Sequence, residues 1–375
     1  MKEIRMVDLH SQYLKLKAEI DTAIGKVLES TTFTKGPEIK QFEGELASYL
    51  NCKHVIACAN GTDALQIALM ALDLKAGDEV IVPDFTFIAT LEVVALLGLK
   101  PVIADVYPNT FTIDLKNVEK KITKKTKAII PVHLFGQCAE MKELQRLADK
   151  HKIFIIEDAA QSLGADYFYP CGTPHKSGTI CNVGCTSFFP SKNLGCFGDG
   201  GALFTNDDNL ADKIHCIANH GWHERYNSEM IGVNSRLDTL QAAILRVKLK
   251  YLDHFNETRQ KTAEFYDNAL AGIKELAVPK RTKNSTHIFH QYTLRILSGK
   301  RNELKKYLEN KGIPTMIYYP IPLHLQKAFK YLGNKEGDFP VTEKLCREVI
   351  SLPMHTEFED EQLQYITGVV KEFFK

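Results

Sequence analysis

The stretch IFIIEDAAQ, residues 153–161, places four apolar residues directly before two acidic side chains. An unbroken apolar run of this length indicates a strand that is buried on both faces. Runs of the same kind recur between residues 54 and 206: HVIAC (54–58), EVIV (79–82), PVIAD (101–105), AIIPV (128–132), TSFF (186–189) and GALFT (201–205). These short strands predict that a large sheet forms the centre of the fold.

Helical patterns separate the first five of these strands, at residues 63–72, 86–97, 115–122 and 140–151. Buried strands that alternate with helices predict an α/β fold, with a mostly parallel sheet covered by helices on both faces. The last two strands follow one another through a glycine-rich turn. We therefore expect the sheet to be mixed at one edge.

The rest of the chain predicts a second, smaller domain. Residues 237–271 carry a helical apolar stripe long enough for a spine between two domains. After it come a strand pattern, a helix pattern, a second strand pattern and a final helix, at 290–296, 300–311, 315–319 and 360–374. We expect a large domain over 1–250 and a small C-terminal α/β domain over 251–375. The amphipathic segment 11–28 could pack on either of them.

Composition excludes several classes of protein. The 375 residues include 47 Lys and Arg against 46 Asp and Glu, a formal net charge of +1, which argues against binding nucleic acid through a basic face. A hydrophobic content of 44% with 25% charged residues is typical of a globular enzyme. No apolar run approaches the roughly 18 residues of a membrane span, and the N-terminal segment lacks the apolar region of a secretory signal.

Nine cysteines, an odd number, fit a reducing cytoplasm better than a disulfide framework. Four of them lie close together in the sequence, but their spacing matches no common zinc motif: Cys171, Cys181, Cys185 and Cys196. We therefore expect a cytoplasmic protein without a metal site.

Polar residues that follow the strands carry the candidate chemistry, because ligands of parallel sheets bind beyond the carboxyl ends of the strands. Gly61 and Thr62 open a helix after one strand, which suits an anion or a plain capped turn. Asp158 follows another strand and could serve a ligand or cap the next helix. Lys192, on a glycine-rich loop, could be a desolvated nucleophile or an ordinary surface lysine.

Together these residues are what pyridoxal phosphate (PLP) requires. The phosphate would take the helix start, Asp158 would keep the pyridine nitrogen protonated, and Lys192 would form the Schiff base. Phe85 would lie on the ring face, although ordinary core packing is the alternative.

Five segments carry a resemblance to a known family: NGTDAL (60–65), PDFTFIAT (83–90), IEDAAQ (156–161), TSFFPSKNLGCFGDGGA (186–202) and GVNSRLDTLQAAIL (232–245). From about residue 7 to residue 357 the chain resembles the DegT/DnrJ/EryC1/StrS family of PLP-dependent nucleotide-sugar aminotransferases, which have the aspartate aminotransferase-like fold type I. Within it, the chain is most similar to the aminotransferases of UDP-2-acetamido-2-deoxy-3-oxo-D-glucuronate in bacterial surface-polysaccharide (O-antigen) pathways.

The resemblance assigns roles to individual residues. It implies Lys192 as the Schiff-base lysine, Asp158 as the partner of the pyridinium nitrogen and Gln161 at the ring hydroxyl. It implies phosphate contacts and a stacking aromatic at Gly61, Thr62, Ser187 and Phe85. Asn234 matches a residue that reaches the phosphate of the neighbouring subunit, so a homodimer with shared sites is implied. The sugar site is implied at Phe33, Ser191, Arg236, Tyr318 and Tyr319. Where this chain has Tyr318-Tyr319, the similar aminotransferases tend to have His-Tyr.

Several alternatives stay open at this point. Arg236 suits a carboxylate, on the sugar or on the amino donor, or a salt bridge to Asp238. His133 could line the site or pack in the core, whereas His324 and His355 are predicted to be structural. The predicted reaction moves an amino group from L-glutamate to C3 of a UDP-2-acetamido-2-deoxy-3-oxo-hexuronate. The alternatives are a C4 or C3 aminotransferase of a nucleotide-linked keto-6-deoxy sugar and a PLP-binding regulator.

Overall fold

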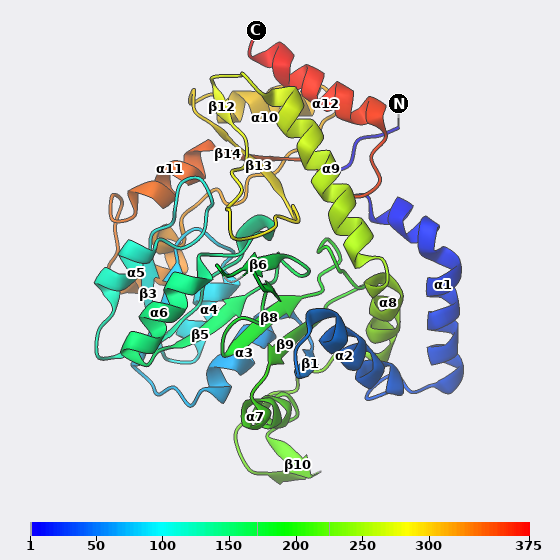
Figure 1. Cartoon of the computed structure of the whole chain (residues 1–375), viewed down its shortest axis with the longest axis vertical. Coiled ribbons are helices and arrows are strands. Elements are labelled where there is room, and N and C mark those ends of the chain that lie inside the picture. Colours follow the sequence, from blue (N-terminus) through cyan, green and yellow to red (C-terminus); the bar gives the residue numbers. More distant parts are fainter. Residues whose placement is uncertain (1, 171, 225) are drawn as a thin grey trace.

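The computed structural model describes residues 2–170, 172–224 and 226–375, and a seven-stranded sheet lies at its centre (Figure 1). The strands occur in the order β1-β9-β8-β5-β4-β2-β3. Their bounds are β1 His54–Cys58, β2 Glu79–Pro83, β3 Lys100–Ala104, β4 Thr126–Ile129, β5 Phe154–Asp158, β8 Val183–Ser187 and β9 Gly201–Thr205. Strands β3, β2, β4, β5 and β8 are parallel, whereas β9 is antiparallel to both β8 and β1. The predicted mixed, mostly parallel sheet is confirmed.

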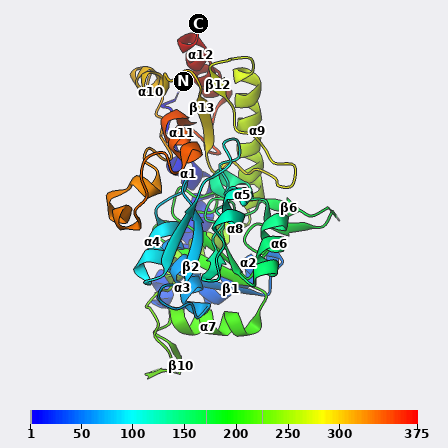
Figure 2. The ribbon, with the colours of Figure 1, turned by 90° about the vertical axis from the view of Figure 1, so that its left-hand side faces the viewer.

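Helices cover both faces of this sheet (Figure 2). Val80 and Val82 of β2 pack in the cluster that contains α3, α4 and α7, whereas Ile81 packs on the other face, with α5 and α6. Strand side chains alternate between faces, so a strand covered twice must be apolar throughout. The helices are α1 Leu9–Ser30, α2 Pro37–Leu50, α3 Gly61–Ala71, α4 Ala89–Leu96, α5 Leu115–Lys121, α6 Met141–His151, α7 Asp208–Ala218, α8 Thr239–Leu249, α9 Leu252–Leu270, α10 Arg301–Asn310, α11 Pro340–Glu348 and α12 Asp360–Phe373.

A second core lies beyond α9, where a three-stranded antiparallel sheet packs against helices. Its apolar cluster joins Tyr266 of α9 to Tyr292 of β13, with ring centroids 4.9 Å apart. The division of the chain into domains at residue 250 stays a prediction. The remaining short elements are β6 Asp166–Phe168, β7 Pro174–Lys176, β10 Trp222–Glu224, β11 Asn227–Ser228, β12 Leu276–Ala277, β13 Tyr292–Ile296, β14 Val349–Leu352 and the 3-10 helices η1 Leu134–Gly136, η2 Leu323–Leu325 and η3 Lys327–Leu332.

Two expected elements differ in the structure. The long helix predicted over 237–271 is two helices, α8 and α9, which meet at Lys250 and Tyr251. The apolar stripe continues through the break because both helices bury a face. The strand predicted over 315–319 does not form, and only Met316 makes a β-bridge, to Ser351. Its apolar pattern reflects packing of Tyr318 and its neighbours in a core cluster.

Helix α1 packs along α8, side by side in Figure 1. Leu16 and Ile20 share a cluster with Ile244 and Val247 of α8 and with Phe255 of α9. The N-terminal helix therefore lies mainly against the residues predicted for the large domain. This placement answers the question that its sequence left open.

Among the residues that the structure describes, no helix is both long and apolar enough to pass through a lipid bilayer.

Candidate active site

A cavity of about 830 Å³ opens at the carboxyl ends of β5 and β8. It lies where ligands of parallel sheets bind. Many of the predicted site residues come together around it: Gly61, Thr62, Asp158, Gln161, Ser187, Ser191, Lys192, Tyr318 and Tyr319.

The start of α3 forms one side of this cavity. Asn60 caps the helix by accepting a hydrogen bond from the Asp63 N–H at 2.8 Å. The N–H groups of Gly61 and Thr62 lie in the first turn, where a helix offers no acceptor of its own. A Cβ on Gly61 would lie 2.7 Å from the Cβ of Ser187, so only glycine lets β8 end this close to the helix. This arrangement suits a phosphate group.

Asp158 ends β5 with its carboxylate almost completely buried. One oxygen accepts the Thr90 hydroxyl at 2.9 Å and the other accepts the Ala160 N–H at 3.2 Å. Burial raises the pKa of Asp158, although these hydrogen bonds and the nearby charge of Lys192 act in the opposite direction. A fixed, buried carboxylate of this kind can balance a single positive charge in the cavity.

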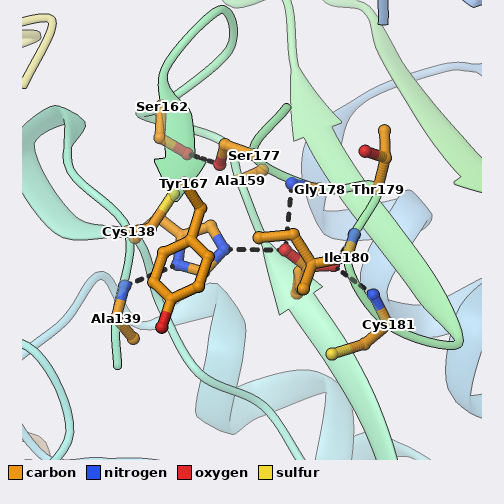
Figure 3. Close-up of polar contacts among 12 residues, drawn as sticks. Cys138, Ala139, Ala159, Ser162, Tyr167, Ser177, Gly178, Thr179, Ile180 and Cys181 are labelled. Carbon is orange, nitrogen blue, oxygen red and sulfur yellow. Dashed lines mark hydrogen bonds and ion pairs between the residues drawn. The ribbon is translucent and has the colours of Figure 1, made fainter. Parts of the chain in front are cut away.

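The adjacent Glu157 points to the other face of the sheet and has a structural part. It accepts three backbone N–H groups that Figure 3 labels: Gly178 (3.0 Å), Ile180 (2.7 Å) and Cys181 (2.8 Å). Its other partner is the Nε2 of His133, at 3.0 Å. Because the Ala139 N–H donates to Nδ1 of His133, the ring carries its hydrogen on Nε2. His133 therefore packs in the core, and the carboxylate of Glu157 ties β5 to the loop before β8.

Lys192 lies on the loop that follows β8. Its N–H donates to the carbonyl of Phe189 at 2.8 Å, and a Cβ on Gly195 would lie 2.4 Å from the carbonyl oxygen of Pro190. The loop therefore turns tightly and directs the lysine inward. Burial lowers the pKa of Lys192 to about 8, even though the carboxylate of Asp158 favours the charged form. A buried amine with this pKa is a competent nucleophile near neutral pH.

Gln161 joins two walls of the cavity. Its Oε1 accepts the Phe135 N–H at 2.8 Å, and its Nε2 donates to the hydroxyl of Tyr319 at 3.2 Å. The amide therefore has a fixed orientation, and Tyr319 is held beside it.

Of the two phenylalanines in the loop PDFTF, Phe87 and not Phe85 lines the cavity. Phe85 is only 1% exposed and packs against Phe111 and Phe135. Its ring is therefore part of the core, which was the alternative to a position on the face of PLP. Phe87 is 54% exposed and lines the cavity. PDFTF contains both rings in one loop, and the sequence offers no signal that separates them.

His290 and Gln291 also line the cavity, and sequence analysis missed both. They lie directly before β13, far along the chain, inside the segment 290–296 that the sequence predicts as a strand. Burial lowers the pKa of His290 well below its usual value, and the charge of Lys192 adds to this effect. His290 is thus a neutral imidazole in the same cavity as Lys192.

Three predicted residues lie away from this cavity. Phe33 is 45% exposed, and Asn234 is exposed as well. Arg236 lines a separate hollow of about 440 Å³ that also contains Lys35. Within the described ranges, Arg236 makes no ion pair with Asp238, so its guanidinium is available to another partner.

The clustered cysteines are buried or half-buried thiols: Cys181, Cys185 and Cys196. Cys171 lies outside the described residues. In the described part of the chain, no three His, Cys, Asp or Glu side chains are grouped so that they could hold a metal ion.

The chain belongs to the DegT/DnrJ/EryC1/StrS aminotransferase family, whose sequence profile matches residues 14–371. The family is PLP-dependent. The chain is 46% identical to a pleiotropic regulatory protein of Geobacillus stearothermophilus, over 99% of both chains. It is also 46% identical to the UDP-2-acetamido-2-deoxy-3-oxo-D-glucuronate aminotransferase of Pseudomonas aeruginosa, over 98% of this chain and 99% of that protein. A UDP-N-acetyl-3-dehydro-α-D-glucosamine 3-aminotransferase of Acidithiobacillus ferrooxidans is 42% identical over 98% of this chain and 97% of its own.

Solved structures agree in fold and cofactor. DesV of Streptomyces venezuelae superposes with a TM-score of 0.96 at 39% identity, covering 100% of this chain and 99% of its own. NtdA of Bacillus subtilis contains bound pyridoxamine phosphate (PMP), the amino form of PLP. It has a TM-score of 0.88 at 32% identity, covering 99% of this chain and 86% of its own. The predicted α/β fold, the aminotransferase class and the PLP cofactor are confirmed.

We expect the apoprotein to capture PLP faster as the pH rises through about 8, because only the uncharged amine of Lys192 reacts. Stopped-flow absorbance between about pH 6 and pH 10 measures this midpoint, which an ordinary lysine would place near 10.4. Borohydride reduction and peptide mapping should then find the cofactor on Lys192, with Lys192→Arg as the control. A midpoint near 10, or a label on another lysine, would contradict the assignment.

Proposed function

We propose that this protein transfers an amino group from L-glutamate to C3 of a UDP-2-acetamido-2-deoxy-3-oxo-hexuronate, in the cytoplasm, for bacterial surface polysaccharide. The observation that carries the reaction class is the cavity that joins Lys192, Asp158 and the start of α3. These groups come from three separate elements, and PLP chemistry needs all of them.

The residues present suit PLP. The first turn of α3 and Ser187 would hold its phosphate, Asp158 would balance a charged ring nitrogen, and Phe87 offers the exposed aromatic surface for a ring face. When bound, PLP stabilises negative charge at the carbon that loses its proton.

The chain's own groups supply the remaining steps. In our proposal, the Nζ of Lys192 accepts a proton from the donor's α-carbon as a base and then, as an acid, delivers a proton to the carbon on the other side of the donor nitrogen. A pKa of about 8 suits both roles, because both protonation states of the amine are populated near that pH. Thr90 and Ala160 orient the carboxylate of Asp158, so its charge is in place before the reaction begins.

Two of the relatives support the position of the reacting carbon. Both are named for UDP-linked sugars that carry an oxo group at C3 and an acetamido group, and they differ at C6. C3 amination of a UDP-sugar is therefore favoured, and the group at C6 is the point of discrimination. A carboxylate there suits Arg236, whose planar guanidinium can bind both oxygens.

Arg236 would act across a subunit boundary. It lies in a different hollow from the cavity of its own chain, and Asn234 and Phe33 are exposed. We propose a homodimer in which Asn234 and Arg236 of each subunit serve the partner's cavity. A half-buried guanidinium with no ion pair to any described residue and an exposed aromatic ring are features that a subunit interface covers.

The second candidate is an aminotransferase of a nucleotide-linked sugar without the C6 carboxylate. The neutral sugar in the name of the Acidithiobacillus ferrooxidans relative favours it. A regulatory role is suggested by the names of two relatives, the pleiotropic regulatory protein of Geobacillus stearothermophilus and a sensory transduction protein of Saccharopolyspora erythraea. A regulator, however, needs no inward-facing lysine with a low pKa.

We expect Asp158→Asn to retain PLP and to lose turnover on the order of a thousandfold, because a neutral amide cannot balance the ring charge. Single-turnover kinetics with L-glutamate measure the loss. Thr90→Val is the matched control: it removes one hydrogen bond from Asp158 and should cost about tenfold. Near-normal turnover in Asp158→Asn would remove Asp158 from this role.

Competition between two acceptors tests the substrate. The pyridoxamine form of the enzyme should aminate the UDP-linked 3-oxo-uronate with a kcat/KM higher by orders of magnitude than that of a keto-6-deoxy sugar on the same nucleotide. The reason is that, in the proposed dimer, a neutral C6 group would leave the covered guanidinium of Arg236 unpaired. Arg236→Leu should reduce the difference in kcat/KM between the two acceptors. A preference for the 6-deoxy sugar would favour the second candidate.

Mixing two inactive variants tests the shared site. Assayed with the 3-oxo-uronate, Lys192→Ala subunits should be inactive alone and Arg236→Ala subunits nearly so. Exchange should restore roughly a quarter of wild-type activity on this substrate, since half of the dimers gain one intact site. Exchange without recovery of activity would show that each subunit is complete.

A further inference from the structure

A buried histidine lies behind the cavity and connects two parts of its wall. Asp84 follows β2 and comes shortly before Phe87, which lines the cavity. His324 lies in η2, a few residues after Tyr318 and Tyr319, which line it as well. We call Phe87, Tyr318 and Tyr319 the aromatic wall.

The contact between Asp84 and His324 is close and completely buried. Both side chains have no exposed surface. One carboxylate oxygen of Asp84 accepts the backbone N–H of His324 at 2.9 Å, and the other is 2.6 Å from its Nδ1. The carbonyl of Asp84 accepts the Leu323 N–H at 3.4 Å. The loop after β2 is therefore bonded to η2 through both main chain and side chain.

The other nitrogen of His324 faces a second carboxylate. Its Nε2 is 3.4 Å from Oε1 of Glu343, on α11, and that oxygen accepts the Gly337 N–H at 2.7 Å. The ring also packs against Phe339, with centroids 4.7 Å apart. His324 thus joins three segments: the loop after β2, η2 and α11.

The two carboxylates beside His324 favour its charged form. Burial alone would lower the pKa of His324, but the hydrogen bond and charge of Asp84, together with the charge of Glu343, outweigh it and raise the pKa. A buried charged pair contributes little net stability compared with an apolar pair of the same shape. What the pair supplies in addition is a fixed geometry, because a charged hydrogen bond tolerates little displacement.

The aromatic wall depends on this geometry. The ring of Tyr319 contacts Phe87 at a centroid distance of 6.3 Å and Phe85 at 6.0 Å. Tyr318 is joined to Tyr319 by the chain and packs in the same cluster. The two halves of the wall thus come from segments far apart in the sequence, and Asp84 bonds to His324 just behind both of them.

We propose that His324, held by Asp84, is a positioning residue that sets the aromatic wall at the spacing required by the nucleotide-sugar acceptor. This proposal rests on the proposed function for the identity of that acceptor. It assigns to His324 an effect on binding of the sugar, through the positions of Tyr318 and Tyr319. Phe87, which would face PLP, lies on a loop that is also held by the core packing of Phe85, so capture of PLP by Lys192 should not change.

Two substitutions of His324 distinguish the effect of its hydrogen bond to Asp84 from the effect of filling the buried space. In His324→Asn the side-chain NH₂ can take the place of Nδ1 and donate to Asp84, whereas His324→Leu fills the space and donates nothing. His355→Leu is the matched control, since His355 is also buried and follows a proline-containing turn but does not line or support the cavity.

The test uses holoenzyme and unreactive UDP-N-acetylglucosamine as the probe, with Kd from calorimetry. We expect His324→Leu to bind the probe about tenfold more weakly and to raise the KM of the keto-sugar by a similar factor, with His324→Asn close to wild type. The rate of the half-reaction with L-glutamate and the affinity for PLP should stay within about twofold in both. Asp84→Asn gives the same comparison where His324→Leu does not fold.

Three results would overturn the proposal: an unchanged Kd in folded His324→Leu, an equal loss in His355→Leu, or a parallel loss of PLP and probe. These results are distinct from failure of the proposed function. That failure would appear as wild-type protein that does not turn over L-glutamate at all, whatever the probe affinity of the variants.

Discussion

A buried amine and a buried carboxylate face the same cavity because β5 and β8 are neighbours in the sheet. Asp158 pairs with Cys185 in the parallel register, and Lys192 follows the end of β8 by a short loop. The pairing of β5 with β8 therefore determines how far the Asp158 carboxylate lies from the segment that carries Lys192. Paired strands are stiffer than loops, so this distance varies little. Their burial then determines their chemistry, since desolvation brings the pKa of Lys192 to about 8 and raises that of Asp158.

The opposite face of the same strands keeps this pairing in place. Glu157 accepts three backbone N–H groups of the loop before β8 and pairs with His133. The two adjacent acidic residues thus face opposite sides of the sheet: Asp158 faces the cavity and Glu157 faces the core. Loss of a carboxylate that serves several buried N–H groups would leave them unsatisfied, so we regard Glu157 as essential to the site although it touches no ligand.

Much of this was predictable from local sequence. Buried strands and the glycine-rich loop that carries Lys192 are short-range patterns with direct physical causes. What could not be predicted depends on contacts between distant segments. His290 reaches the cavity from the residues directly before β13, and nothing near it in the sequence marks that position. Phe85 and Phe87 have the same local chemistry, and only packing against Phe111 and Phe135 separates them. The break between α8 and α9 leaves no trace in the apolar stripe, because burial continues on both sides of it.

The position of β9 has a consequence for how the molecule is made. Strand β1 lies at the sheet's end and is bonded within the sheet to β9, with Cys58 opposite Gly201. A Cβ on Gly201 would lie 2.4 Å from the carbonyl oxygen of Asn60, so this late glycine forms part of the floor beneath the α3 start. During synthesis, β1 therefore has no partner strand in the sheet until β9, which ends at Thr205, has been made. Pairings so distant along the chain have a high contact order and are slow to form. Until then β1 is an unpaired edge, exposed to association with other chains, during synthesis as well as during refolding.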